Sequence, residues 1–512
     1  MKRNIVFCFF LVCFATSVRA QIASADSVNI LQAERLEVIP GSSIQSLAGK
    51  VKIQQGSTLF FCDSCILNAQ AHTFEAFGNV HINDSDTAKL WANYLRYLTD
   101  QKKAYLTGNV KLSDGNVTLT TKALEYDVNY KIGTYTNGGR VVSRKTVLTS
   151  GEGTYYTDVK DFYFRKNVEL KDPGYTLKAD SLLYNTQTQV ARFIAQTYIR
   201  DSSGRVIRTR EGYYDTRARR SEFTQRTSIQ DKALFVAGDR IASDDSSGII
   251  QIEGRGVMID TSKGMNLLAD RIFVDKKRDA LLATKKPVMT IKQKTDSFFV
   301  AADTLFSAKL SDLYGLKTKN TKSDSTDRYI EAYRNVRVYS DSMQSIGDSL
   351  FYSFKDSIFR LFQGPAVWSK KSQITGDTIY VYTKNQKADR IKVIENSFLI
   401  TEVQPSVYNQ IKSARMDGYF KEGTIDSVRA KGFAESIYFL QDKDSAFTSV
   451  NQTASDAIDI YFNKGELYKV VLRSNVKGDM FPISYKPVGE MRLQNFLWLD
   501  KKRPKSKYDL FQ

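Results

Sequence analysis

The 512-residue sequence has few of the side chains that most enzymes and metalloproteins use, with two histidines and four cysteines. Only His72 and His81 could join Cys62 and Cys65, which leaves a zinc site short of ligands. The sequence also contains no P-loop, dinucleotide-binding glycine motif or nucleophile elbow. These absences predict that the protein is not an enzyme and uses no cofactor and no metal.

Long hydrophobic runs are missing after the N-terminus. Lys2 and Arg3 precede an apolar run from Ile5 to Ala15, and Val18-Arg19-Ala20 is a small-x-small cleavage site. This pattern is typical of a secretory signal peptide, predicted here as residues 1–20. A lipid anchor on Cys13 fits poorly because bulky residues precede it. No other run approaches the roughly 20 residues of a membrane span, so we expect a periplasmic protein, with association at the outer membrane as a further expectation.

The charge balance is basic. The formal net charge is +18, and +15 remains once Lys2, Arg3 and Arg19 are removed with the signal. The excess is spread along the chain, which favours an anionic partner such as a phosphate-bearing lipid or a polysaccharide, or simply aids solubility. Nucleic acid is not expected as a partner, because no nucleic-acid-binding module is present.

Helical periodicity is also lacking, whereas strand signals are abundant. No apolar stripe with helical spacing persists for the roughly 11 residues of an ordinary helix. Alternating segments such as Val117–Thr120, rich in β-branched and aromatic residues, are separated by turn-forming joins such as Ser113–Asn116. Short joins imply hairpins, so we predict an all-β fold with antiparallel neighbouring strands.

The strands belong to a repeat of about 29–30 residues, each holding two extended segments. One column has the pattern small-acidic-x-aliphatic-x-aromatic, and a second column, about half a period away, has a Val that in most copies follows Gly, Asn or a basic residue. The acidic column contains Glu34, Asp63, Asn93, Glu152, Asp180, Glu211, Asp239, Asp270, Asp303, Asp348 and Asp377, and the second contains Val51, Val80, Val110, Val168, Val257, Val288, Val336 and Val367.

Gly or Asn just before the second-column Val suits a corner where a long strand bends. Bent strands repeated in register predict a V-shaped, elongated sheet with an apolar trough inside and polar groups outside. The residues expected to line this trough are Leu95, Leu106, Val110, Leu124, Val168, Leu182, Ile241 and Ile272.

Two features suggest chemistry but have simpler interpretations. Glycosidases need two carboxylates across one bond, whereas a carboxylate every 30 residues is better explained as a strand-start or turn acceptor for backbone N–H groups. The CxxC motif Cys62–Cys65 lies in a strand pattern and not at the start of a helix. It is interpreted as a candidate local disulfide or as two packed thiols.

The repeat resembles the OstA/LptA family of lipopolysaccharide transport proteins. The matching segments are Gly49-Lys50-Val51, Gln55-Gly56, Asp63, Ala76–Val80 and Ala92–Tyr97. The resemblance is good from about Glu34 to Val288 and looser to about residue 400. It implies a β-jellyroll whose apolar interior holds the acyl chains of lipopolysaccharide. It also implies end-to-end stacking by strand pairing, which forms a bridge between the two membranes.

The predicted organisation follows from the regularity of the period. After the signal, residues 21–310 form OstA-like repeats, 311–328 a polar loop or hinge, 329–480 a more divergent OstA-like β region, and 481–512 a basic, Pro-containing cap or tail.

The function expected is a periplasmic lipid-binding bridge or chaperone in lipopolysaccharide transport and outer-membrane assembly. Its expected partners are lipopolysaccharide or a related anionic glycolipid, and other envelope transport proteins through edge-strand pairing, with head-to-tail self-association as a further option. The alternative is a structural or adhesive exported β-solenoid with a closed core and no lipid ligand.

Overall fold

The computed structural model describes residues 27–511 except 86–87, 293–296, 316–325, 385–386, 443, 445, 465 and 486. The predicted signal peptide, residues 1–20, and most of the predicted polar loop therefore lie outside the described residues. The chain forms two compact units that divide between Arg165 and Lys166, and each is described by itself. The domain boundaries expected from the sequence stay predictions.

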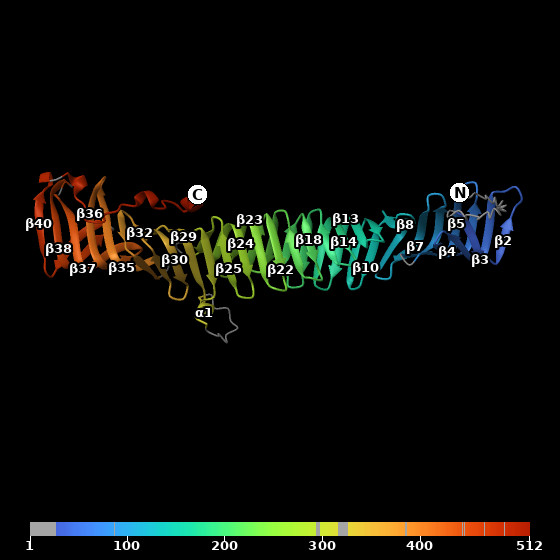
Figure 1. The fold of residues 1–512 in the computed structure, drawn as a ribbon, viewed down its shortest axis with the longest axis horizontal. Helices are drawn as coiled ribbons and strands as arrows, with labels where there is room; N and C mark the ends of the chain where they lie inside the picture. Colours follow the sequence, from blue (N-terminus) through green and yellow to red (C-terminus); the bar gives the residue numbers. More distant parts are fainter. Residues whose placement is uncertain are drawn as a thin grey trace, which may run out of the picture. The chain divides into compact units, whose positions relative to one another are not determined.

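Both units are built from antiparallel strands (Figure 1), as the sequence predicts. The first unit contains β1 (Val28–Gln32), β2 (Arg35–Val38), β3 (Ile44–Gln55), β4 (Thr58–Asn68), β5 (Thr73–Asp84), β6 (Ala88–Leu98), β7 (Lys103–Ser113), β8 (Val117–Asp127), β9 (Ile132–Tyr135), β10 (Gly139–Ser143), β11 (Thr146–Ser150), β12 (Glu152–Tyr156) and the first part of β13 (Asp161–Asp172).

The second unit continues β13 and adds the strands that follow it along the chain. They are β14 (Tyr175–Asn185), β15 (Val190–Phe193), β16 (Thr197–Asp201), β17 (Val206–Thr209), β18 (Gly212–Asp215), β19 (Arg220–Phe223), β20 (Thr227–Asp231), β21 (Leu234–Gly238), β22 (Arg240–Asp244), β23 (Ile249–Asp260), β24 (Met265–Asp275), β25 (Ala280–Thr284), β26 (Val288–Lys292), β27 (Ser297–Ala301), β28 (Thr304–Ala308), β29 (Tyr329–Tyr339), β30 (Gln344–Ser353), β31 (Ile358–Phe362), β32 (Ala366–Ser369), β33 (Ser372–Thr375), β34 (Thr378–Lys384), β35 (Lys387–Gln404), β36 (Val407–Lys421), β37 (Thr424–Gln441), β38 (Phe447–Asn463), β39 (Glu466–Arg473) and β40 (Lys477–Pro482).

The few helical turns of the described residues all lie in the second unit: α1 (Leu310–Leu313), η1 (Ile483–Tyr485), η2 (Val488–Glu490), η3 (Asp500–Lys502) and η4 (Lys507–Phe511).

Bent strands give each unit two walls. In β24, Met265–Leu268 pairs with β26, whereas Arg271–Asp275 pairs with β25. In the first unit, the register between β5 and β6 shifts between Phe77 and Val80 in the same way. We call wall A the wall that contains β2, β9 and β12 in the first unit and β25 and β28 in the second. Wall B contains β1, β10 and β11 in the first unit and β26 and β27 in the second.

The bend consists of two successive residues in the left-handed region. Gly78 and Asn79 have φ of +70° and +43°, and Arg334 and Asn335 have +62° and +52°. Glycine and asparagine adopt this conformation most readily among the residues. The corner predicted just before the second-column Val is therefore confirmed.

The acidic column lies beside the bend of the neighbouring strand and fixes it. Asn79 donates from Nδ2 to Asp63 Oδ2 at 2.9 Å, and the matching Asn-to-Asp distances are 3.1 Å at Asp303, 2.8 Å at Asp377 and 2.8 Å at Asp456. In two other repeats a cation takes the place of the Asn amide. Lys50 lies 3.0 Å from Glu34, and Arg255 lies 2.8 Å from Asp239. The acidic residues also donate their own N–H groups to bend carbonyls, as Asp239 does to Gly254 O at 2.9 Å.

The sequence-based interpretation of this column is partly wrong about the donor. The carboxylates mostly accept from side chains at the bend, although Asp270 Oδ1 does accept the backbone N–H of Arg255 at 3.4 Å. Asp239, Asp303 and Asp377 do stand directly before β22, β28 and β34, as a strand-start position requires.

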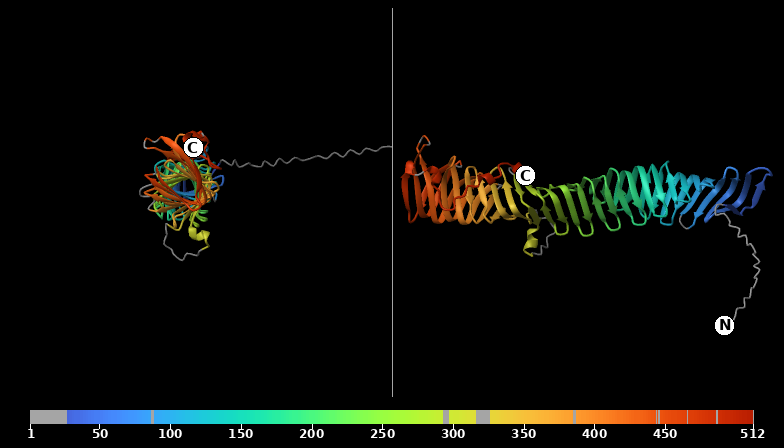
Figure 2. Two further views of the ribbon diagram at one scale, coloured as in Figure 1. Left: turned by 90° about the vertical axis from the view of Figure 1, so that its left-hand side faces the viewer. Right: turned by 45° about the horizontal axis from the view of Figure 1, so that its top comes forward.

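The last residues of the second unit lie across the outer face of wall B. In Figure 1 this segment runs from β40 back toward β29, and Figure 2 shows it from two further sides. Gln410 donates to Met491 O (2.9 Å) and accepts from Leu493 N (2.8 Å). Gln373 does the same with Leu497 O and Leu499 N, both at 2.7 Å. Leu510 then packs against Val288 and Ala301.

Adding a methyl group at the bend should destabilise the first unit more than adding one in an open turn. A Cβ on Gly78 would lie 2.4 Å from Asp63 Oδ2, whereas one on Gly115, also left-handed at φ +90°, has no atom within 4 Å. We expect Gly115→Ala to lower the free energy of unfolding by about 1 kcal/mol. Gly78→Ala should lower it by about 1 kcal/mol more, because the contact between Asn79 and Asp63 is also lost.

Urea unfolding of both variants, followed by circular dichroism, measures the difference. If Gly78→Ala and Gly115→Ala lower the free energy of unfolding equally, the acidic column does not stabilise the bend.

Candidate functional site

The residues predicted to line the trough point into the space between the walls. Leu95, Leu106, Val110, Leu124, Val168, Leu182, Ile241 and Ile272 each have at most 2% of their surface exposed. Arg96, the neighbour of Leu95, is exposed on the outer face. A side chain with no surface open to water has no cavity beside it, so the protein's own side chains fill the interior at these positions. A lipid-lining role for them stays a prediction.

Aromatic rings contribute to this filling. Phe60 of wall B packs against Phe74 and Tyr97 of wall A, with ring centroids 5.1 and 4.7 Å away. Phe74 and Tyr97 are 4.9 Å apart. Such edge and tilted arrangements are favourable for aromatic rings. The two walls of the first unit are therefore in direct apolar contact.

A row of tyrosines closes the rim opposite the bend in the first unit. Tyr97 donates to Gln55 Oε1 at 2.7 Å, Tyr126 donates to Asp84 Oδ2 at 2.6 Å, and Tyr155 donates to Asp114 Oδ2. Each tyrosine belongs to wall A, whereas each acceptor ends a strand or begins a turn of wall B. We call these six residues the seam.

Two lysines of wall A contact the carboxylates of the seam from the solvent side. Lys131 Nζ lies 2.5 Å from Asp84 Oδ1, and Lys160 Nζ lies 3.1 Å from Asp114 Oδ2. Both carboxylates are fully buried, whereas the lysine side chains are 25% and 23% exposed. A buried carboxylate is tolerated when a cation and hydrogen-bond donors compensate it.

The protonation states suit these contacts. Burial, followed by the nearby carboxylates, raises the pKa of Tyr97 and of Tyr126 above the usual range. Burial alone would raise the pKa of Asp114, but hydrogen bonds from Tyr155, Lys160 and two backbone N–H groups outweigh it and lower the pKa. At neutral pH Tyr97 and Tyr126 are therefore neutral donors and Asp114 is an ionised acceptor.

In the second unit, ion pairs take the corresponding place at the rim. Arg205 of wall B contacts Asp245 of wall A at 3.2 Å, and its side chain is only 16% exposed. Lys263 of wall B contacts Asp279 of wall A at 2.8 Å. Both units thus join their walls by polar contacts on the side away from the bend.

Sequence reasoning missed the seam, although a signal was present. Tyr97, Tyr126, Tyr155 and Tyr184 recur at intervals of 29 residues, as the aromatic position that follows the acidic column. The acceptors of the first three lie 41 or 42 residues earlier in the chain. The pairing therefore depends on how far one wall is displaced along the other.

Cys62 and Cys65 are free thiols, and both are buried. A hydrogen bond with Cys62, together with burial, raises the pKa of Cys65. The structure has the two thiols packed together, and the disulfide between Cys62 and Cys65 stays a prediction. Among the described residues, no group of three or more His, Cys, Asp or Glu is arranged to hold a metal ion.

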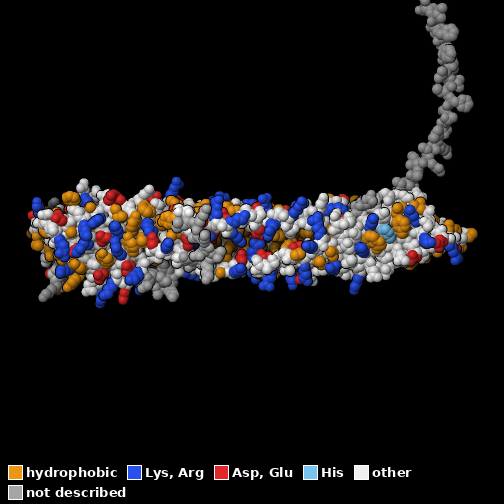
Figure 3. Space-filling view, turned by 90° about the horizontal axis from the view of Figure 1, so that it is seen from below, with side chains coloured by type: hydrophobic (Ala, Val, Ile, Leu, Met, Phe, Trp, Pro, Cys, Tyr) orange, Lys and Arg blue, Asp and Glu red, His pale blue; other side chains and the backbone are white. Residues whose placement is uncertain are grey.

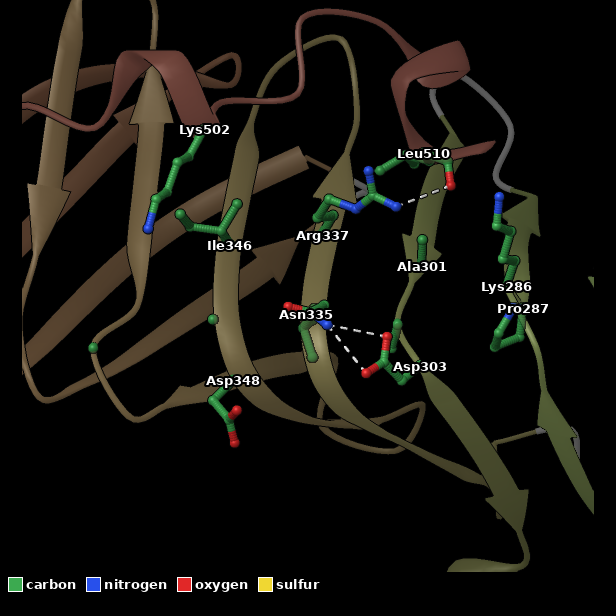
Figure 4. Close-up of a pocket in the computed structure, with 14 residues that line it drawn as sticks. Lys286, Pro287, Ala301, Asp303, Asn335, Arg337, Ile346, Asp348, Lys502 and Leu510 are labelled. Carbon is green, nitrogen blue, oxygen red and sulfur yellow. Dashed lines mark hydrogen bonds between the residues drawn. The ribbon is translucent and has the colours of Figure 1, made fainter. Parts of the chain in front are cut away.

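A cavity of about 730 Å³ lies outside the walls of the second unit, between the bend and the C-terminal segment (Figure 4). Asp303 and Asn335 lie on one side of it, and the other lining residues include Lys286, Arg337, Asp348, Lys502 and Leu510. Its mixture of cations, carboxylates and apolar groups selects no particular ligand charge.

Lys and Arg side chains are scattered over the face shown in Figure 3, with Asp and Glu between them. This distribution agrees with the even spread of basic residues along the sequence. In the part of the chain that the structure describes, no helix has the length and apolar character needed to cross a bilayer.

The geometry defines a class: an antiparallel β protein whose two walls repeat bent strands around an apolar interior. Residues 25–180 match the family model of OstA-like proteins, which confirms the resemblance for that part of the chain. No curated protein matches the chain. A solved structure of LptH, the LptA-homologous periplasmic component of the lipopolysaccharide transport device of Pseudomonas aeruginosa, is 15% identical, with a TM-score of 0.20 over 25% of this chain and 81% of that one. A likeness of this size carries no argument about function.

The contribution of Asp114 to stability should depend on pH. Because its pKa is lowered in the folded protein, the stabilisation is present above the unfolded pKa of about 4 and is lost as the pH falls below it. We expect Asp114→Asn to lower the free energy of unfolding by about 1–3 kcal/mol at pH 7. The difference from the wild-type protein should shrink toward pH 2.

Urea unfolding between pH 2 and pH 7 tests this dependence, with Asp158→Asn at an exposed carboxylate as the control. A difference that does not change with pH would contradict the assignment of an ionised Asp114.

Proposed function

We propose that the protein is a periplasmic carrier of lipopolysaccharide or a related anionic glycolipid in outer-membrane assembly, and that it holds acyl chains between its two walls. The observation that carries this proposal is the apolar, two-walled interior, in a chain whose first part is OstA-like. The net charge of +18 suits an anionic ligand.

Ligand binding requires the walls to separate, because the interior is filled. An acyl chain would then replace contacts between the walls by contacts of similar apolar character. Each CH₂ group removed from water contributes about 0.8 kcal/mol. Several acyl chains would therefore offset the loss of wall-to-wall packing, with little need for strong polar contacts.

The N-terminal edge of the first unit suits the partners proposed for such a carrier. Leu36 and Val38 of β2 are 53% and 52% exposed, whereas Leu47, the partner of Leu36 in β3, is 1% exposed. An open strand edge with exposed apolar residues pairs readily with another strand. We propose that another envelope transport protein, or a second copy of this chain, adds a strand here.

A second candidate function is a structural or adhesive β-protein that works through its outer surface. The observation that favours it is the near-zero exposure of the interior residues. The two functions differ in whether a lipid ever reaches these side chains.

Photo-crosslinking distinguishes them. A benzophenone amino acid replaces Leu124 or Leu182, both interior, or Arg96, which is exposed, in cells that make labelled lipopolysaccharide. We expect adducts from the two interior positions and none from Arg96. If protease resistance shows that the variants are folded, an absence of interior adducts would favour the closed structural protein.

A further inference from the structure

The rim closed by the seam is the side on which the walls of the first unit can part. At the bend, the walls share the backbones of β3 to β8. At the opposite rim, each hairpin turn joins two strands of the same wall, as Gln55–Thr58 does in wall B and Asn68–Thr73 in wall A. Side-chain contacts join the walls there, and these contacts break without any loss of strand pairing.

We propose that the seam is a gate, at which acyl chains enter as the tyrosine contacts break and a lipid phosphate group takes Lys131 and Lys160 from their carboxylates. This inference rests on the proposed function and adds to it the route of uptake and a head-group site.

The lysines connect the ligand to the gate. Each is partly exposed, so a phosphate group in solvent reaches Lys131 or Lys160, whereas Asp84 and Asp114 are fully buried. Before the tyrosine contact breaks, the donors to Asp84 that remain among the described residues are the hydroxyls of Thr58 (3.0 Å) and Tyr126 (2.6 Å). A buried carboxylate without its cation is strongly unfavourable. Phosphate binding and seam closure therefore compete for the same ammonium groups.

The side chains directly behind the seam are apolar and buried, as an acyl chain requires. Tyr97 is both a seam residue and a member of the aromatic cluster with Phe60 and Phe74. When its contact with Gln55 breaks, a chain passing the rim meets these rings first. In this proposal the hydrogen bonds of the seam close the rim, and the apolar side chains behind it bind the acyl chain that enters.

Kinetics of uptake by the purified full chain test the gate. The probes are fluorescently labelled lipopolysaccharide and dansyl-undecanoic acid, which has an acyl chain but no phosphate. Tyr126→Phe removes a seam donor, and Tyr135→Phe is its matched control. Tyr135 is equally buried in wall A, but its hydroxyl contacts Ser150 at 2.7 Å, next to the bend.

We expect Tyr126→Phe to take up both probes about 3–10-fold faster than the wild-type protein, since one buried hydrogen bond of this kind is lost. Tyr135→Phe should behave as the wild-type protein does. Tyr97→Phe is a second seam variant, in case Tyr126→Phe does not fold. Equal rates in all these folded proteins would overturn the gate and leave the carrier function standing, whereas no uptake by any of them would overturn both.

Inorganic phosphate tests the lysines separately from the lipid. It should accelerate uptake of dansyl-undecanoic acid by the wild-type protein, because it competes for Lys131 and Lys160. It should have no effect on a variant that combines Lys131→Gln, Asp84→Asn, Lys160→Gln and Asp114→Asn, which keeps the tyrosines but loses both ion pairs. If inorganic phosphate has no effect but the lipopolysaccharide probe still enters faster than dansyl-undecanoic acid in the wild-type protein only, the site is specific for a lipid head group. If phosphate accelerates uptake by the two proteins equally, or has no effect while the lipopolysaccharide probe enters the wild-type protein no faster than dansyl-undecanoic acid, the head-group site is overturned.

Discussion

The contact between an acidic residue and the bend of the next strand is the constraint on which both units depend. A strand can serve two walls only if it turns sharply at its middle, and two successive left-handed residues produce that turn. Left-handed residues other than glycine are unfavourable on their own. The carboxylate of Asp63, or of its counterparts, compensates by holding the Asn79 side chain in place. Because this contact recurs along the stack, each bend supports the next one.

Much of this architecture could be predicted from the sequence, since it depends on local periodicity. The acidic column and the Gly-Asn-Val column identify the bend, and the alternation around Leu95 identifies the inner face. The pairing of Tyr126 with Asp84 could not be predicted, because it depends on the displacement between two walls that no local pattern encodes. Gln373 and Gln410 were missed for a related reason, since an isolated glutamine in a strand has no distinctive spacing.

The bend and the seam give the first unit two unlike margins. One margin is the continuous backbone of the bent strands, whereas the other consists of side-chain contacts among tyrosine hydroxyls, carboxylates and lysines. Between them lies a filled apolar interior, which is stable while closed. The proposed carrier needs no permanent opening, because contacts of the two walls with a bound lipid would replace the contacts between the walls.

The C-terminal segment has a mechanical consequence. A stack of paired strands loses its members one by one from a free edge, since an outermost strand has only one neighbour. The segment after β40 is fastened to Gln410, then to Gln373, and finally beside Val288. Before β38 and β40 can separate from the sheet, the C-terminal segment after β40 must therefore detach as well. The C-terminal edge of the second unit thus has an extra attachment, whereas among the described residues β1 and β2 of the first unit pair with β3 alone.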